Sequence, residues 1–169
     1  AERPAGYDEA IIQILTETHT PATLFLGGLW MQRHPNQTQA LASNPLFELA
    51  SHSWSHQDFS GLTVEEMSAD IERTQVFMAK LTGRQPVVFR FPFDVGSPEA
   101  LAVVNRHGLQ AISGDVVSGD PDPGISAGAM VKAVTGQAQN GSIVIMHMNT
   151  WGWHTAEALP EIVEQLREQ

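Results

Sequence analysis

The stretch "LFELASHSWSHQDFSG", residues 46–61, joins a short apolar run to two histidines that lie four positions apart. The run 46–51 has the length and apolar character of a buried strand, and His52 and His56 follow the point where it would end. Two imidazoles at this spacing can bind one divalent cation, although a carboxylate usually supplies a third ligand. The alternative is that both histidines are polar surface on a loop.

The remainder of the chain alternates similar apolar runs with segments of helical pattern. The other runs predicted as strands cover 22–28, 87–92, 109–117 and 142–148. The segments predicted as helices cover 7–18, 62–83, 97–108, 126–141 and 155–169. Most of the runs are continuously apolar, which is typical of strands buried on both faces. The alternation therefore predicts an α/β fold with a parallel sheet, either doubly wound or closed as a (β/α) barrel.

The ends of two helices are marked by capping residues. In "LTVEEMSADIERTQVFMAKLTG", Thr63 and Glu66 have the spacing of a capping box, and Gly83 stands where the helix should stop. In "SPEALAVVNRHG", Ser97 is the expected N-cap and Pro98 occupies the first turn, where proline is tolerated.

Composition limits the classes of function. The chain has 169 residues, enough for one domain, and its nine basic and nineteen acidic residues give a formal charge of −10. This charge argues against binding to nucleic-acid phosphates or to an anionic membrane. The chain has no cysteine, so any metal must be held by His, Asp or Glu. No apolar run has the length of a membrane span, and no signal peptide is recognisable.

Polar residues recur where the predicted strands end. His52 and His56 follow one strand, Arg90 lies near the end of the next, Asp120 follows the third, and His147 ends the fourth. In parallel sheets the chemistry gathers at the carboxyl edge of the strands, so we expect these five side chains to share one rim. Each also has a simpler interpretation, namely loop surface for the histidine pair, a structural ion pair for Arg90, a turn for Asp120 and a core position for His147.

Four short motifs give a more specific indication when they are taken in order. "HSWSH", "FRFP", "SGDVVSGDP" and "IVIMH" resemble the second to fifth motifs of the polysaccharide deacetylases, the NodB-homology group also called carbohydrate esterase family 4. The resemblance covers nearly the whole chain, including "PATLFLGG" and "TAEALPEIVEQL". It implies a distorted (β/α) barrel, here with the first and last strands missing.

The resemblance also implies roles for individual residues. His52 and His56 resemble the two histidine ligands of a divalent metal, most often Zn²⁺ and sometimes Co²⁺ or Ni²⁺. Arg90 resembles the arginine that orients the catalytic base. Asp120 is similar to the aspartate that tunes the catalytic histidine, and His147 matches that histidine, the general acid.

Four further residues are candidates for contact with the substrate. By resemblance, the backbone N–H of Phe93 is the oxyanion donor, and Ile145 stands where the family has a leucine lining the acetyl pocket. Trp151 and Trp153 in "NTWGWHT" suit stacking on pyranose rings; the alternative is that they anchor a glycine-containing loop.

The chemistry that the resemblance implies is metal-assisted hydrolysis of an acetyl group. The metal would polarise the acetyl carbonyl and lower the pKa of its bound water, and a carboxylate base would take a proton from that water. The metal and an N–H group would stabilise the tetrahedral oxyanion. His147, kept protonated by a neighbouring carboxylate, would donate a proton to the leaving amine.

The family's first motif, T-F-D-D-G or a variant, has no counterpart here, because the chain begins "AERPAGYDEA", already at a helix. That motif supplies the base aspartate and the carboxylate ligand, so we expect residues 1–169 to be a single domain that is incomplete at its N-terminus. A separate N-terminal segment would then complete it. Asp94 or Asp58 could stand in as third ligand, although loop surface is the better interpretation of both.

The leading functional hypothesis is a metal-dependent enzyme that removes N-acetyl, or alternatively O-acetyl, groups from peptidoglycan or chitin-like polysaccharide. It predicts a secreted, periplasmic or cell-wall location. The alternatives are a catalytically inactive deacetylase-like carbohydrate-binding domain and a structural metal-binding barrel. Neither nucleic acid nor membrane insertion is expected.

Overall fold

The computed structural model describes residues 6–149 and 151–169, so Thr150 in "NTWGWHT" lies outside the described residues. The chain divides into two compact units, and each is described by itself. One unit is Ala22–Ser113, and the other combines Ala1–Pro21 with Gly114–Gln169. That both are parts of one domain stays a prediction.

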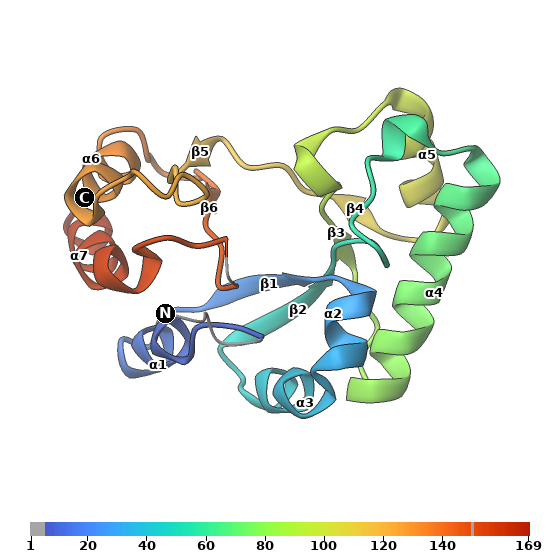
Figure 1. The fold of residues 1–169 in the computed structure, drawn as a ribbon, viewed down its shortest axis with the longest axis horizontal. Coiled ribbons are helices and arrows are strands. Elements are labelled where there is room, and N and C mark those ends of the chain that lie inside the picture. The colour runs from blue at the N-terminus through green and yellow to red at the C-terminus, as the bar shows by residue number, and fades with distance from the viewer. Residues whose placement is uncertain (1–5, 150) are drawn as a thin grey trace. The chain divides into compact units, whose positions relative to one another are not determined.

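The unit Ala22–Ser113 is built on a four-stranded parallel sheet (Figure 1). In sheet order its strands are β1 (Ala22–Leu26), β2 (Phe47–Ser51), β3 (Val88–Phe89) and β4 (Gln110–Ala111). Its helices are α2 (Gly28–Arg33), α3 (Pro35–Ser43), α4 (Val64–Thr82) and α5 (Pro98–Arg106), with short 3₁₀ turns η1 (Phe59–Gly61) and η2 (Pro92–Asp94). The parallel α/β class predicted from the sequence is confirmed.

The predicted helix caps of this unit are present. Thr63 and Glu66 form the capping box of α4, and Gly83 ends the helix in the left-handed conformation at φ 73°. Ser97 caps α5 by accepting a hydrogen bond from the N–H of Ala100. These caps satisfy backbone groups that each helix end would otherwise leave without partners, so the local sequence fixes where α4 and α5 begin.

Aromatic rings fill the core beneath α4 and α5. Phe59, Phe89 and Phe91 are buried, and the centroids of each pair of these rings lie between 5.0 and 5.6 Å apart. Met67 and Ile71 of α4 pack against them. This cluster anchors β3, which Arg90 follows, and η1, which follows the loop after β2, so it gives both segments a rigid base.

The second unit contains α1 (Glu9–Glu17), β5 (Val116–Val117), α6 (Ala127–Thr135), β6 (Val144–Ile145) and α7 (Thr155–Glu168). Strands β5 and β6 pair in parallel. Helix α7 packs against α6 and α1 (Figure 1). Buried apolar side chains of α6, α7 and β5 form one cluster. Pro160 lies inside α7, which begins at Thr155.

The structure differs from the sequence-based expectation in two places. The run 109–117 is not one strand, because β4 and β5 belong to different sheets and Gly114 lies between them. Helices α2 and α3 were not predicted, and Gly28, assigned to the first strand, begins α2. Among the described residues no helix has both the length and the apolarity to cross a membrane.

Candidate functional site

The histidine loop, residues 52–56, leaves the carboxyl end of β2. The Nδ1 atom of His52 lies 2.9 Å from the backbone oxygen of Arg90. Because a carbonyl oxygen can only accept, Nδ1 must carry the proton of this hydrogen bond, and in the neutral ring Nε2 then carries the lone pair. This tautomer is the one in which Nε2 of His52 can bind a metal.

His56 ends the histidine loop in a left-handed backbone conformation that residues other than glycine rarely adopt. Its φ is 57°, and Ser53 in the same loop has φ 64°. The N–H of His56 donates to the Ser53 hydroxyl oxygen at 2.9 Å, which stabilises the tight turn. The turn brings the imidazole centroids of His52 and His56 to 4.9 Å, with the rings at 80° to each other. The loop surface proposed as the alternative does not require such a strained turn.

Arg90 follows β3, and its side chain is half-buried. Its guanidinium lies 4.4 Å from the centroid of the Phe25 ring, and Nε donates to the backbone oxygen of Ile112 at 3.4 Å. Burial lowers the pKa of Arg90, while the attraction of the Asp94 carboxylate acts in the opposite direction. The guanidinium is therefore held in a fixed place beside the backbone that orients His52.

Phe93 lies next to His56, with 4.8 Å between the ring centroids and an edge-to-face arrangement. Its side chain is 66% exposed and its φ is 58°. Asp94, a candidate third ligand, accepts a hydrogen bond from the Ser113 hydroxyl at 2.5 Å. Asp58, the other candidate, accepts from the N–H of Ser60 at the start of η1, so it serves as a cap.

The histidine pair could fill two coordination positions of a divalent cation such as Zn²⁺. The two rings lie close to each other, and the tautomer of His52 is fixed. Residues 6–149 and 151–169 contain no group of three His, Asp or Glu side chains that could hold a metal ion. The described donor set is thus a pair, to which a third ligand has to be added.

The second unit contains a carboxylate–imidazole pair. Asp120 is buried, 1% exposed, and its Oδ1 accepts a hydrogen bond from Nδ1 of His147 at 2.9 Å. Its Oδ2 accepts from the backbone N–H of His147 at 2.5 Å and from the hydroxyl of Thr155 at 2.9 Å. The imidazole of His147 is partly exposed, at 37% of the side chain, so Nε2 can meet a substrate while Nδ1 stays on the buried carboxylate.

The remaining candidates of the second unit are more dispersed. Ile145 lies in β6 and fills the space beside Gly114, where an added Cβ would lie 2.3 Å from Cγ1 of Ile145. The backbone N–H of Trp153 donates to the backbone oxygen of Asp120 at 2.8 Å, which ties the tryptophan loop to the acid pair. Trp151 is 64% exposed. The loop anchor and the sugar platform remain alternatives for the two tryptophans.

The structure thus brings together His52, His56, Arg90 and Phe93 in one unit, and Asp120 with His147 in the other. That all of them share one rim stays a prediction. Sequence reasoning missed Thr155 as a partner of Asp120 and Phe25 as a partner of Arg90. The position of Thr155, directly before an apolar helix, signalled a helix start, while Phe25 had the appearance of an ordinary strand residue.

Comparisons with known proteins identify relatives of the whole chain. The family described as "Polysaccharide deacetylase" matches residues 2–112. A peptidoglycan-N-acetylglucosamine deacetylase of Bacillus cereus is 26% identical over 160 residues, which cover 93% of this chain and 57% of that protein. The chain spans between 27% and 62% of the length of the first curated relatives that it matches.

Two solved structures share the fold. A family 4 carbohydrate esterase from Streptomyces lividans, in complex with acetate, is 28% identical with a TM-score of 0.88, and the match covers 98% of this chain and 83% of that one. A carbohydrate esterase family 4 pseudoenzyme from Bacillus anthracis also has a TM-score of 0.88, at 22% identity over 95% of this chain and 56% of that one. These matches confirm the predicted α/β fold of the NodB type.

Proposed function

We propose that this chain, which belongs to the polysaccharide deacetylase family, contributes to the metal-dependent hydrolysis of acetyl groups on a polysaccharide. The observation that carries the proposal is the buried Asp120 that holds Nδ1 of His147 while the ring stays partly exposed. The alternative hypothesis of a structural metal-binding barrel does not explain the Asp120–His147 pair.

His147 is the proposed general acid. Its hydrogen bond to Asp120 uses Nδ1, which leaves Nε2 to deliver a proton to the leaving group. An amide needs this proton, because an amine anion is too poor a leaving group to depart alone. Thr155 and the N–H of His147 hold the carboxylate in place, which keeps the imidazole oriented.

His52 and His56 are the proposed metal ligands. A divalent cation bound there, such as Zn²⁺, which imidazole ligands suit, would supply Lewis acidity toward an acetyl carbonyl and water. Arg90 holds the tautomer of His52 through its backbone oxygen. The backbone N–H of Phe93 is the proposed oxyanion donor, and Ile145 the proposed lining of the acetyl pocket.

The proposed substrate is an N-acetylated glycan such as peptidoglycan or a chitin-like chain, with Trp151 and Trp153 as stacking surfaces. O-acetylated polysaccharide is the less demanding variant, because an alkoxide leaves more easily than an amine anion. Action on peptidoglycan implies a location outside the cytoplasmic membrane or in the cell wall. The Bacillus cereus relative, a peptidoglycan deacetylase, supports this assignment.

The test is acetate release by the full protein from N-acetylglucosamine oligomers, with Zn²⁺ or Co²⁺ added and with a chelator. We expect chelation to abolish release and His147→Ala to lower it by about 10²- to 10⁴-fold. His154→Ala is the matched control, because the exposed His154 bonds only to Glu157 among the contacts described for its ring. Full activity of the His147→Ala variant would remove His147 from the mechanism.

The second candidate function is carbohydrate binding without hydrolysis. It is favoured by the absence of a three-ligand metal group among the described residues and by the exposed Trp151. This candidate predicts that the full protein binds the same oligomers in calorimetry but releases no acetate with any of the added metals. Metal-dependent release would exclude it.

A further inference from the structure

Asp70 lies on α4, and its carboxylate accepts two hydrogen bonds from the histidine loop. The backbone N–H of Trp54 donates to Oδ1 at 2.7 Å, and the hydroxyl of Ser55 donates to Oδ2 at 3.3 Å. Trp54 and Ser55 lie between His52 and His56 in the chain. One side chain of α4 therefore fixes the middle of the loop that carries both imidazoles.

The opposite edge of the histidine loop is held by the first turn of α2. The N–H of Gly28 donates to the backbone oxygen of Ser53, and the N–H of Leu29 donates to that of Trp54, both at 2.9 Å. The two carbonyls thereby satisfy N–H groups that the start of a helix leaves without intrahelical partners. Trp54 is bonded on both sides, through its oxygen to α2 and through its N–H to Asp70.

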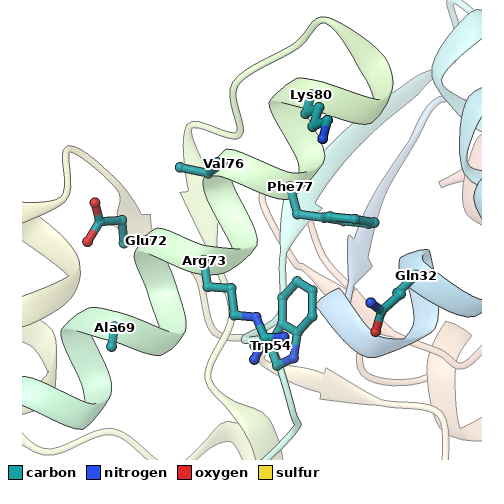
Figure 2. A pocket seen from close by; sticks show the side chains of 8 residues that line it. All are labelled: Gln32, Trp54, Ala69, Glu72, Arg73, Val76, Phe77 and Lys80. Carbon is teal, nitrogen blue, oxygen red and sulfur yellow. The ribbon is translucent and has the colours of Figure 1, made fainter.

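The indole of Trp54 is packed onto the same face of α4 (Figure 2). The guanidinium of Arg73 lies 3.8 Å from the indole centroid, and the ring of Phe77 meets the indole edge-to-face at 5.4 Å. These residues line a surface pocket of about 520 Å³ together with Gln32 of α2. Asp70, Arg73 and Phe77 follow one another at helical spacing, so a single face of α4 receives the loop.

The carboxylate of Asp70 is kept there against a cost. Burial raises the pKa of Asp70, while the hydrogen bonds from Trp54 and Ser55 and the attraction of Arg73 oppose that rise. Burying a carboxylate is therefore unfavourable if the side chain serves only to pack. Its two oxygens, however, can accept hydrogen bonds from a backbone N–H and a hydroxyl at once.

We propose that Asp70 is a positioning residue that orders the histidine loop so that His52 and His56 are held ready for a divalent cation. This inference rests on the proposed function, because it takes the two histidines to be metal ligands. Asp70 bonds to Trp54 and Ser55, and it acts on the two imidazoles through them. Residues that orient metal-binding histidines typically change metal affinity by about 10- to 100-fold.

The experiment measures Co²⁺ binding by calorimetry and the exchange rate of the Trp54 amide by NMR, in the full protein. We expect Asp70→Ala to weaken Co²⁺ binding about 10-fold or more and to speed exchange of the Trp54 amide. Asp70→Asn keeps the side-chain volume and one acceptor oxygen, so its effects should be intermediate. It replaces Asp70→Ala as the test variant if Asp70→Ala does not fold. Glu72→Gln, on the exposed side of the same helix, is the matched control and should change neither quantity.

The positioning role and the metal pair can fail separately. If Asp70→Ala binds Co²⁺ as tightly as the wild-type protein while His52→Ala loses binding, the role of Asp70 is overturned and the histidine pair stands. If the wild-type protein binds no Co²⁺, both are overturned, because there is no ion to prepare for. A drop in affinity that follows global unfolding, with exchange rising equally at core amides of α5, would also overturn the positioning role.

Discussion

His52 and His147 each use Nδ1 for a hydrogen bond within their own unit, at the same distance of 2.9 Å, but the two acceptors differ in charge. For His52 the acceptor is the backbone oxygen of Arg90, and for His147 it is the carboxylate of Asp120. Both hydrogen bonds orient the ring, but the carbonyl is neutral and the carboxylate is charged, and hydrogen bonds to charged groups are the stronger ones. The same side chain is proposed as a metal ligand in one unit and as the general acid in the other.

The two clusters also differ in what holds them. Around His52 the support is shared: the histidine loop is bonded by the backbone of Gly28 and Leu29 and by the carboxylate of Asp70, and its indole is enclosed. Around His147 one buried carboxylate receives three hydrogen bonds. We therefore expect the acid pair to depend on a single side chain, whereas the order of the histidine loop depends on Asp70, on backbone bonds and on packing together.

The largest effect is expected from Asp120→Ala, which removes the acceptor of all three hydrogen bonds. Acetate release should fall by about 10²- to 10⁴-fold, as for loss of a general acid. The free energy of unfolding should fall by about 1–3 kcal/mol, because buried donors lose their partner. The measurements are acetate release and urea unfolding of the full protein.

Asp122→Ala is the matched control for this change. Asp122 is exposed, and its carboxylate accepts from the N–H of Gly124 in a turn. The Asp122→Ala variant removes the same charge two residues away from Asp120. Surface substitutions rarely change the free energy of unfolding by more than about 0.5 kcal/mol, so acetate release should stay within about twofold of wild type. Equal activity losses in the two variants would show that net charge, and not the Asp120–His147 pair, matters.

Packing around the histidine loop is tested at Gly28. An added Cβ at Gly28 would lie 2.1 Å from Cε3 of Trp54, and the indole cannot swing away because Arg73 and Phe77 enclose it. Gly28→Ala should lower the free energy of unfolding by about 1–3 kcal/mol through overpacking, measured by urea unfolding. Gly61→Ala is the control, because nothing lies within 4 Å of an added Cβ there. Equal stability of the two variants would mean that the indole is not tightly enclosed.

Part of the site could be predicted from the sequence because it consists of side chains in recognisable motifs. The spacing of His52 and His56 and the order of the motifs predicted the histidine pair, and the resemblance paired Asp120 with His147 across 27 positions. The tautomer of His52 could not be predicted, because the hydrogen-bond partner of its Nδ1 is a backbone oxygen. Every residue has a backbone oxygen, so the sequence does not single out the one that bonds. Asp70 was missed for a different reason: on an amphipathic helix a lone aspartate has the pattern of a solvated surface residue.

The fold was predictable where the chain carries strong periodicity and caps, as in α4. Helices α2 and α3 were missed because α2 has only six residues and α3 buries a polar residue, Thr38, among its few core contacts. The run 109–117 was taken as one strand because periodicity alone does not reveal that pairing partners change at Gly114. Pairing is decided by contacts distant in sequence, which short apolar runs do not encode.

The smallest effects come from two serines that flank His52. Both are fully buried, but the Ser53 hydroxyl accepts from the N–H of His56, whereas the Ser51 hydroxyl has no hydrogen-bond partner within the described part of the chain. Ser53→Ala should lower the free energy of unfolding by about 1 kcal/mol, because the tight turn loses a bond. Ser51→Ala should leave it within about 0.5 kcal/mol or raise it slightly, since it removes a buried polar atom that is not paired.

The two serine variants can be compared directly because the chemical change is identical at both positions. Urea unfolding measures the stability difference, and Co²⁺ affinity shows whether the turn at His56 has changed. We expect Ser53→Ala to weaken Co²⁺ binding and Ser51→Ala to leave it unchanged, because only the Ser53 hydroxyl bonds to a residue of the histidine pair. If Ser51→Ala is the more damaging variant, the histidine loop depends on the end of β2 more than on its own internal bond.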